Sequence, residues 1–491
     1  MKPIKKAASV SKAKSPKQGT AKKTGAKKAE AETTKAAPSE RHYFGTDGVR
    51  GLANVPPISC ELALALGRAV THVAGRGKTH TPRILIGKDT RLSCYMIEQA
   101  LASGICSMGG RVILCGPVPT PAIAHLTLSM RADAGIVISA SHNPYQDNGI
   151  KIFGGDGFKL PDYVEHEIES FIDHPQKMGA LPTGPGIGRA DKLEDSRGRY
   201  VVFAKNAFPS DLSLDGVNIV VDAANGAAYK VAPMVFAELG ANVTAIGVKP
   251  NGVNINEECG ALHPDSVRAE VVKRGAAIGI ALDGDADRLI VVDEKGQVVD
   301  GDAVMAICAK RMMKDKELKK NTLVATVMSN LGLERAINKL GGTLVRTNVG
   351  DRYVVDAMRK GGFNLGGEQS GHLIFLDHAS TGDGTIAALQ VLALMIRLGI
   401  PLSELAKEAM ERVPQVLENV SFSRKVPLEK MSHLGLVETK IQKALGKEGR
   451  TLIRWSGTEP KLRIMLEGPD EKTIQRYAKE LAAAAKKDIP N

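Results

Sequence analysis

The chain has 491 residues and a mass of 52.2 kDa, enough for about three or four domains, and its 43% hydrophobic content excludes a wholly disordered protein. Its net charge of +12 is concentrated at one end: residues 1–40 hold 11 Lys, no Arg and three Glu, a net charge of +8, which leaves +4 for the other 451 residues. The longest apolar run, near residues 385–396, stops at Arg397 and is shorter than the roughly 18 residues that a transmembrane span needs, so no span is predicted.

Residues 1–40 are predicted to form a disordered, Lys-rich tail, because Lys, Ala, Ser and Thr cannot bury enough apolar surface to fold alone. A polyanion-binding arm is the alternative for this tail, and it is the one feature that would suggest a nucleic-acid partner. The cysteines include no Cys-x-x-Cys pair, so a disulfide scaffold and a zinc site are both disfavoured and a reducing, cytoplasmic location is expected. They are Cys60, Cys94, Cys106, Cys115, Cys259 and Cys308.

The body of the chain repeats one pattern three times. In each copy a buried strand is followed by a helical stretch, a glycine and a second strand, which is the pattern of a βαβ unit. The strand pairs are predicted over residues 83–89 and 109–116, 218–222 and 240–247, and 322–326 and 341–346. Three copies predict three similar α/β domains with mixed or parallel sheets, and the change of pattern after about residue 412 predicts a smaller C-terminal α+β domain.

Each copy continues into a third strand that ends in a polar, glycine-containing loop. These loops are Ala140-Ser-His-Asn-Pro144, Asp283-Gly-Asp-Ala-Asp-Arg288 and Gly367-Glu-Gln-Ser-Gly-His372. Open α/β sheets bind ligands beyond the carboxyl ends of their strands. We therefore expect these loops, together with one loop of the C-terminal domain, to line a central cleft.

The second of these loops is predicted to bind a metal ion. Asp283, Asp285 and Asp287 alternate along the chain, so that a tightly turned backbone presents three carboxylates together, which suits Mg²⁺ bound also to a phosphate. An EF-hand is disfavoured because Arg288 takes the place of the required glycine and the flanking segments are predicted strands. An acidic hairpin turn without a metal is the structural alternative, and it would leave three like charges uncompensated.

Ser141 and His142 suggest a nucleophile, but without a Gly-x-Ser-x-Gly motif a serine-hydrolase triad is weakly supported. Ser141 could instead carry a phosphoryl group that a metal and basic neighbours neutralise during transfer. The alternative is an ordinary Ser/Asn turn in front of Pro144, and the residues of this loop alone leave both interpretations open.

Two further loops are candidates for substrate binding. The segment from Arg454 to Arg463 places Ser, Gly and Thr in a turn between basic residues, which favours a phosphate-binding loop over a surface turn. Glu368, Ser370 and His372 are spaced so that they can face one side and contact sugar hydroxyls, although a solvated turn would show the same spacing.

Seven motifs in order, from about Tyr43 to the C-terminus, resemble the α-D-phosphohexomutase superfamily, and within it the branch that acts on glucosamine phosphates. The motifs are Phe44-Gly-Thr-Asp-Gly-Val-Arg50-Gly51, Ser139-Ala-Ser-His-Asn-Pro144, Asp147-Asn-Gly-Ile-Lys151, Asp283-Gly-Asp-Ala-Asp-Arg288, Val349-Gly-Asp-Arg352-Tyr353, Gly367-Glu-Gln-Ser-Gly-His372 and Arg454-x-Ser-Gly-Thr-Glu-Pro460. The resemblance does not extend to the tail over 1–40. It implies a phosphoserine domain over 41–195, a metal-binding domain over 196–299, a sugar-binding domain over 300–411 and a phosphate-binding domain over 412–491.

The resemblance also implies a role for each motif. Ser141 would be the phosphoserine, with Mg²⁺ on its phosphate and on Asp283, Asp285 and Asp287. Arg50 and Arg288 would steady the transferring group, and Lys151 or His142 would assist proton transfer. The substrate would be held by Glu368, Ser370, His372, Arg352, Arg454, Ser456, Gly457, Thr458 and Arg463.

The implied activity is that of an isomerase that interconverts glucosamine 6-phosphate and glucosamine 1-phosphate through a 1,6-bisphosphate, which also serves as primer, for UDP-N-acetylglucosamine synthesis. A phosphomannomutase/phosphoglucomutase is the alternative enzyme, and a non-catalytic sugar-phosphate-binding protein is the alternative of another class. The expected partners are small sugar phosphates and a kinase that primes Ser141, without a membrane or nucleic acid, in a monomer or homodimer.

Overall fold

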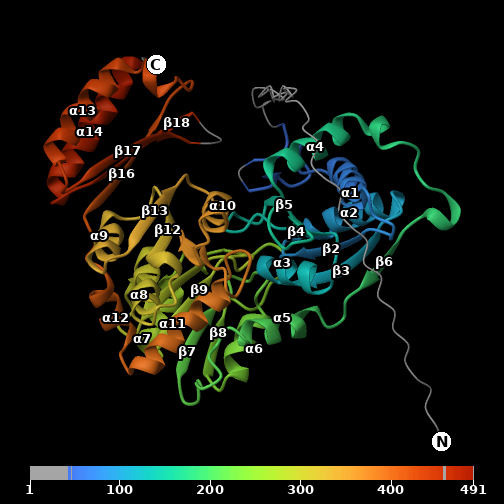
Figure 1. Ribbon diagram of the computed structural model, residues 1–491, viewed down its shortest axis with the longest axis horizontal. Helices are drawn as coiled ribbons and strands as arrows, with labels where there is room; N and C mark the ends of the chain where they lie inside the picture. The colour runs from blue at the N-terminus through green and yellow to red at the C-terminus, as the bar shows by residue number, and fades with distance from the viewer. Residues whose placement is uncertain (1–41, 46, 457–459, 490–491) are drawn as a thin grey trace, which may run out of the picture. The chain divides into compact units, whose positions relative to one another are not determined.

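The computed structural model describes residues 42–489 except 46 and 457–459, so the predicted tail lies outside the described residues. The described residues belong to one compact unit. It contains four sheets, and each sheet is built from its own consecutive stretch of the chain (Figure 1). The predicted α/β architecture with a smaller C-terminal domain is confirmed.

The first sheet has the strand order β1-β5-β4-β2-β3-β6, in which β5 is antiparallel both to its neighbour β4 in the parallel core and to β1 at the edge. Alternation along β2 sends Ile84 and Ile86 to the face that α1 and α2 cover, and Leu85 to the face that α3 covers. The elements are β1 (Val49–Leu52), α1 (Cys60–Gly75), β2 (Arg83–Lys88), α2 (Cys94–Ser107), β3 (Arg111–Pro117), α3 (Thr120–Ser129), β4 (Ala134–Ile138), β5 (Asp147–Gly154), α4 (Asp162–Asp173), β6 (Arg189–Lys192) and α5 (Ser196–Lys205).

The second sheet has the order β11-β10-β9-β7-β8, with β7 parallel to both β8 and β9. Its elements are β7 (Asn218–Asp222), α6 (Val231–Glu238), β8 (Asn242–Ile246), α7 (Asp265–Arg274), β9 (Ile278–Leu282), β10 (Leu289–Asp293) and β11 (Val298–Val299). The acidic loop therefore connects β9 to its antiparallel neighbour β10.

The third sheet repeats this plan in the order β13-β12-β14-β15, with β12 parallel to β13 and β14. Its elements are α8 (Gly301–Lys314), β12 (Thr322–Thr326), α9 (Leu331–Lys339), β13 (Thr343–Thr347), α10 (Asp351–Gly361), β14 (Leu365–Gly367), β15 (Leu373–Phe375), α11 (Gly384–Leu398) and α12 (Leu402–Ala409). The predicted glycines before the second strands, Gly109, Gly240 and Gly341, have φ angles of 81°, 101° and 79°, which end the preceding helices in each copy.

The C-terminal sheet is antiparallel in the order β16-β18-β17, and α13 and α14 pack together along it (Figure 1). Its elements are β16 (Gln415–Ser421), α13 (Ser432–Leu445), β17 (Arg450–Trp455), β18 (Lys461–Glu467) and α14 (Glu471–Asp488). Short 3₁₀ turns lie outside these elements, at Pro175–Met178, Gly184–Gly186, Lys319–Asn321 and Leu428–Lys430.

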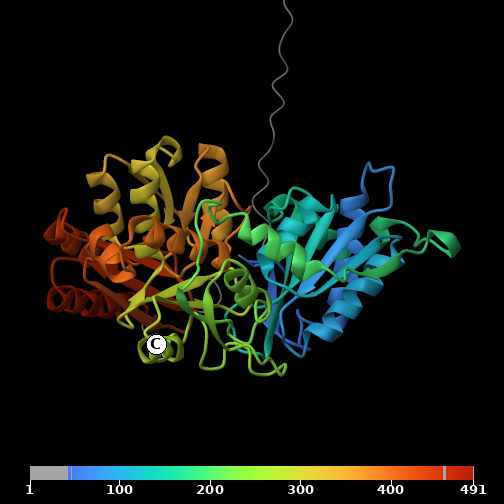
Figure 2. The same ribbon diagram turned by 90° about the horizontal axis from the view of Figure 1, so that it is seen from below.

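The cores differ between the parts of the chain. One continuous buried cluster contains side chains of all three α/β units, and both views place the second unit, in green, beside the other two (Figures 1 and 2). The main cluster of the C-terminal unit contains its own residues alone. Polar contacts join this unit to the third, for example from the Arg450 guanidinium to the backbone oxygens of Val327 and Ser329 at 2.9 and 2.6 Å.

Among the described residues, no single helix is long and apolar enough to cross a membrane, whereas α11 and α12, bent by 99° at their junction, reach that length and composition as a pair.

Asp302, at the start of α8, makes folding stability depend on pH. Burial raises the pKa of its carboxyl from 3.8 to about 7, although Oδ2 accepts a hydrogen bond from the Asn330 N–H at 2.8 Å. Between these two pKa values the unfolded chain ionises Asp302 and the folded chain does not, so its contribution to stability falls as pH rises from about 4 to 7. We expect Asp302→Asn to raise the free energy of unfolding by about 2 kcal/mol at pH 8 and by much less at pH 4.5, as measured by urea denaturation. A difference that does not change with pH would contradict this assignment.

Candidate active site

Three loops that follow equivalent strands converge in the structure. The first follows β4 and carries Ser141, the second follows β9 and carries the three aspartates, and the third follows β14 and carries Glu368. The hydroxyl of Ser141 donates a hydrogen bond to Oδ2 of Asp283 at 2.5 Å, although the two residues are 142 positions apart. Both side chains are buried.

The acidic loop has the arrangement of a metal site. Asp283, Asp285 and Asp287 are buried, and one oxygen of each lies within 4.8 Å of the others. One carboxylate oxygen of Asp285 and one of Asp287 are buried without a hydrogen-bond partner in the described structure. Burial, with help from the charges of Asp287 and Asp285, raises the pKa of Asp283 well above its usual range. Unpartnered, crowded carboxylate oxygens fit a hard divalent cation.

Lys151 contacts this loop, and His142 contacts Ser141. The Nζ atom of Lys151, which is 1% exposed, lies 2.8 Å from Asp285 and 3.3 Å from Asp287. The Nδ1 atom of His142 lies 3.3 Å from the Ser141 hydroxyl. Burial, followed by the nearby guanidiniums of Arg288 and Arg50, lowers the pKa of His142 to about 4, so its ring is neutral at physiological pH.

Arg50 and Arg288 are the two arginines that the sequence predicted to act near the serine. Arg50 pairs with Asp47 and donates from Nη1 to the backbone oxygen of Ala140 at 3.3 Å, next to Ser141. The backbone N–H of Arg288 donates to Asp283 at 3.1 Å, and its Nε is buried without a hydrogen-bond partner among the described residues. Arg50 thus contacts the residue that precedes Ser141, and the backbone of Arg288 contacts the carboxylate to which Ser141 donates.

Sequence reasoning missed three residues that join this cluster: Asp47, Lys159 and Asp351. Lys159 pairs with Asp47 and with Asp351, the latter at 2.6 Å, and Asp47 also lies 3.3 Å from Lys151. His372 closes the network, because its two ring nitrogens lie 3.6 Å from Asp287 and 3.5 Å from Asp351.

The result is a closed ring of alternating acidic and basic side chains from all three α/β units. Asp47 and Asp351 fall inside quoted motifs, whereas Lys159 follows the turn after β5 and forms an antiparallel bridge back to Phe153. Nothing in the sequence paired these three residues with one another.

The sugar-binding candidates lie partly in this ring. The pKa of His372 is raised, because Asp287 and Asp351 outweigh the effect of its burial. Glu368 is buried, accepts a hydrogen bond from the backbone N–H of Gly350 at 3.0 Å, and lies 3.5 Å from the Ser370 hydroxyl. These three candidates therefore face the same part of the structure as the acidic loop.

The C-terminal candidates form a separate basic group. Arg454 and Arg463 are directly paired residues of β17 and β18, and the Nε atoms of both are buried without a hydrogen-bond partner among the described residues. Burial and the charge of Arg463 lower the pKa of Arg454, whereas Glu368 of the third unit acts in the opposite direction. Ser456 is buried, while Gly457 and Thr458 lie outside the described residues.

Arg352 is not brought into the cluster. Its guanidinium pairs with Asp162 and with Glu165, the latter at 2.7 Å, both on α4 of the first unit. It lines a cavity of about 270 Å³ together with Lys159 and Asp351, beside the ring of charges. Its assignment as a substrate ligand stays a prediction.

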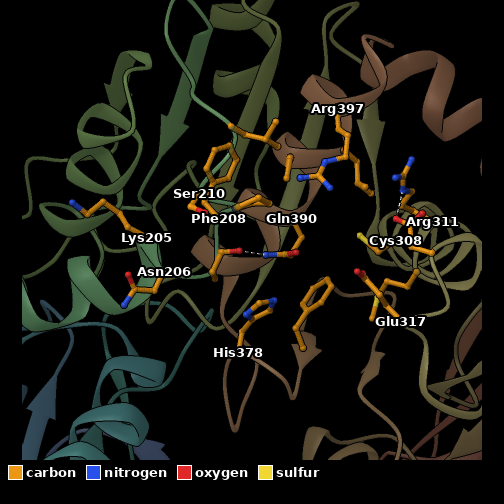
Figure 3. Close-up of a pocket in the computed structure, with 18 of the residues that line it drawn as sticks. Lys205, Asn206, Phe208, Ser210, Cys308, Arg311, Glu317, His378, Gln390 and Arg397 are labelled. Atoms are coloured by element: carbon orange, nitrogen blue, oxygen red, sulfur yellow. Dashed lines mark hydrogen bonds and ion pairs between the residues drawn. The ribbon is translucent and has the colours of Figure 1, made fainter.

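A second cavity, of about 690 Å³, is lined by none of the predicted site residues (Figure 3). Its lysine and two arginines are each paired with a carboxylate: Lys205 with Glu238, Arg311 with Asp315, and Arg397 with Asp211 at 2.9 Å. Gln390 donates to the backbone oxygen of Ala207 at 2.7 Å (Figure 3). This cavity offers no group that the chemistry of the serine and acidic loops could use.

Comparisons with known proteins cover nearly the whole body of the chain. Four models of the phosphoglucomutase/phosphomannomutase family match: alpha/beta/alpha domain I over residues 41–178, domain II over 199–296, domain III over 300–413, and the C-terminal domain over 400–484.

Named relatives match at high identity. A phosphoglucosamine mutase of Sorangium cellulosum is 65% identical over 95% of this chain and 97% of its own, and one of Myxococcus xanthus is 59% identical over 93% and 99%. Among solved structures, a phosphoglucomutase/phosphomannomutase family protein from Burkholderia thailandensis has a TM-score of 0.76 at 23% identity, covering 91% of this chain and 98% of that one. The N-acetylphosphoglucosamine mutase of Aspergillus fumigatus, solved with GlcNAc-6P and magnesium, has a TM-score of 0.61 at 17% identity, covering 92% and 96%.

Proposed function

The chain belongs to the phosphoglucosamine mutase family of the phosphohexomutases, and from this premise we propose that it interconverts glucosamine 6-phosphate and glucosamine 1-phosphate. The observation that carries the proposal is the hydrogen bond from the Ser141 hydroxyl to Asp283, beside two unpartnered carboxylate oxygens. A serine in that position can carry a phosphoryl group next to a cation. The choice of glucosamine rests on the 65% identical relative.

An isomerase that acts on two different oxygens of one sugar needs one reacting site and one distal anchor. We propose that phosphorylated Ser141 donates its phosphoryl group to the free hydroxyl of the substrate, which gives a 1,6-bisphosphate. The bisphosphate turns over within the site and returns its other phosphate to Ser141. Arg454, Ser456, Gly457, Thr458 and Arg463 would hold the phosphate that is not reacting in each orientation.

The metal is proposed to be one Mg²⁺, held by Asp283, Asp285, Asp287 and the phosphate on Ser141. When bound, it would neutralise charge on the transferring group. The unpartnered oxygens of Asp285 and Asp287 support this assignment, since oxygen ligands are those that Mg²⁺ prefers.

Basic side chains are proposed to stabilise the charge of the transferring group and to move protons. Arg50 and Arg288 would stabilise the equatorial charge of the transferring phosphoryl group. Lys151 is buried among carboxylates and is proposed to move the proton of the reacting hydroxyl. His142, neutral at physiological pH, would assist by hydrogen bonding next to Ser141.

Glu368, Ser370 and His372 are proposed to hold the sugar hydroxyls in either orientation. The C-terminal unit has a main core of its own, so we propose that it moves toward the other three units and closes over the substrate. Closure would keep water from the phosphate on Ser141, because water attack there would make the enzyme a phosphatase.

The cellular context follows the same proposal. Product would feed UDP-N-acetylglucosamine synthesis, and Ser141 would be primed by a kinase or by a hexose 1,6-bisphosphate. The six cysteines, all within the described residues, are free, which supports a reducing compartment such as the cytoplasm. The protein is proposed to act as a monomer or a homodimer.

The proposal is tested by the rate of conversion of three substrates: glucosamine 6-phosphate, glucose 6-phosphate and mannose 6-phosphate, each with Mg²⁺ and matching bisphosphate. We expect kcat/KM for glucosamine 6-phosphate to exceed the other two by at least about tenfold, because a site built for one polar substituent rejects its replacement. Equal turnover of the three would replace this assignment with a phosphomannomutase/phosphoglucomutase. Binding without any turnover, even after priming, would leave a sugar-phosphate-binding protein.

A further inference from the structure

The backbone of Ser141 is held in an unfavourable conformation. Its φ angle is +54°, in the left-handed region that residues with a side chain rarely adopt. Such a conformation persists only where surrounding contacts impose it. Its N–H donates to the Ser139 hydroxyl at 3.0 Å, and that hydroxyl donates in turn to Asp89 at 2.5 Å.

Arg91 holds the carbonyl side of the same loop. Its side chain is fully buried, and its guanidinium donates to four backbone oxygens of the loop and to Asp89. Nη2 reaches the oxygens of Ser141 at 3.0 Å and Asn143 at 2.8 Å. Nη1 reaches those of Pro144 and Asp147, and Nε lies 2.8 Å from Asp89. A planar guanidinium presents five N–H donors in a fixed fork, and here all of them are used within the first unit.

Asn256 grips the same two oxygens from the second unit. Its Nδ2 donates to the Ser141 oxygen at 2.9 Å and to the Asn143 oxygen at 3.0 Å. Each of these two oxygens therefore accepts one hydrogen bond from Arg91 and one from Asn256. The acidic loop lies against the backbone oxygen of Ser141, since a Cβ added to Gly284 would come within 2.5 Å of that oxygen.

The charge of Arg91 does not reach the reacting atoms. Asp89 neutralises its guanidinium within 2.8 Å, and its other bonds go to backbone oxygens, whereas the Ser141 hydroxyl points to Asp283. Asn256 is uncharged. Neither residue can therefore act by neutralising a phosphate.

We propose that Arg91 and Asn256 form a two-sided backbone clamp, in which they are positioning residues that fix Ser141 against the acidic loop. The inference rests on the proposed role of Ser141 and deepens it. Arg91 sets the shape of the serine loop within the first unit. Asn256 ties that loop to the second unit, which carries the aspartates, so the serine and its carboxylates stay in register. Displacement of a nucleophile by about 1 Å can lower a rate about 100-fold.

Asn256→Ala tests the clamp, because Asn256 lies in a loop with 9% of its surface exposed and Arg91 still holds the serine loop in the variant. We expect kcat for glucosamine 6-phosphate to fall roughly 10- to 100-fold while KM changes less than about threefold, because the loss falls on the position of the nucleophile and not on substrate binding. Hydrogen–deuterium exchange of the peptide over residues 139–147 is expected to become faster in the same variant.

Thr90→Val is the matched control. The Thr90 hydroxyl donates to the backbone oxygen of Asn225 at 2.6 Å, so it bridges the first and second units without touching the serine loop. We expect this variant to keep kcat within about twofold of the wild type and to leave exchange over 139–147 unchanged. Asn256→Gln, which keeps the amide, is expected to recover part of kcat.

Three results would overturn the clamp. Unchanged exchange over residues 139–147 in Asn256→Ala would show that Asn256 does not hold the loop. Faster exchange with unchanged kcat, or an equal loss of kcat in Thr90→Val, would show that the bond does not position the nucleophile. The exchange measurement needs no substrate, so a wild type that is inactive on sugar phosphates would refute the proposed function while exchange still decides the clamp.

Discussion

Ser141→Ala is expected to lower the rate of interconversion of glucosamine 6-phosphate and glucosamine 1-phosphate by at least about 10⁴-fold. The hydroxyl of Ser141 lies 2.5 Å from Asp283 and is the proposed carrier of the phosphoryl group, so its removal eliminates the covalent step instead of weakening it. The measurement is Mg²⁺-dependent conversion with bisphosphate primer, together with the intact mass of the protein. Wild-type protein should show the mass of one added phosphoryl group, and the variant none.

Ser93→Ala is the control for this variant. The Ser93 hydroxyl accepts a hydrogen bond from Asn148 at 2.8 Å in the same unit, away from the acidic loop, and its loss should leave conversion within about threefold of the wild type. Retention of more than about 1% of the rate by Ser141→Ala would contradict the phosphoserine mechanism. The enzyme would then have to carry the phosphoryl group on a residue other than Ser141.

Much of the fold could be predicted from local sequence pattern. The interiors of the runs Arg83–Lys88 and Asn218–Asp222 are continuous and apolar, which is typical of strands covered on both faces, and each run is followed by a helix-length segment and a glycine. The alternation of Asp283, Asp285 and Asp287 placed three carboxylates in one loop before any contact was known. Such patterns can be recognised in a short stretch of sequence, because neighbouring residues along the chain determine them.

The residues that the sequence did not reveal act over long distances along the chain. Lys159 pairs with Asp351, 192 positions away, and Asn256 reaches the Ser141 oxygen across 115 positions. No periodicity or motif encodes such a partner, because it depends on how separate units pack. The role of Arg91 could not be predicted for a different reason. Its five hydrogen bonds go to backbone oxygens and to a neighbouring aspartate, and a basic residue after a strand is as common on a solvated surface as in a buried position of this kind.

Arg454 and Arg463 present the second large effect, because the structure keeps two like charges side by side at a cost. They are paired across β17 and β18, and their Nε atoms are buried without hydrogen-bond partners among the described residues. Directly opposed like charges on neighbouring strands are destabilising, and a buried unsatisfied donor is more so. An anion that bound between them would remove both penalties.

We therefore expect Arg463→Met to lower kcat/KM for glucosamine 6-phosphate roughly 100-fold, mainly through KM, because a charge-assisted bond to the non-reacting phosphate is lost in every state of the reaction. The same variant should unfold at an equal or higher temperature than the wild type, since the like-charge pair is gone. Arg476→Met on α14 removes the same charge from an exposed pair with Glu480 and should change neither quantity.

Opposite signs for activity and stability distinguish a binding pair from a structural one. If Arg454 and Arg463 supported the C-terminal sheet, Arg463→Met would lower the unfolding temperature and KM would change only as the folded fraction fell. If the two arginines bind a phosphate, inorganic phosphate should raise the unfolding temperature of the wild type and not that of the variant. Ligand binding stabilises only the folded state, in which the site exists. Under the proposed function, binding of the non-reacting phosphate accounts for two arginines, and not the apolar residues that a sheet prefers, at facing positions of β17 and β18.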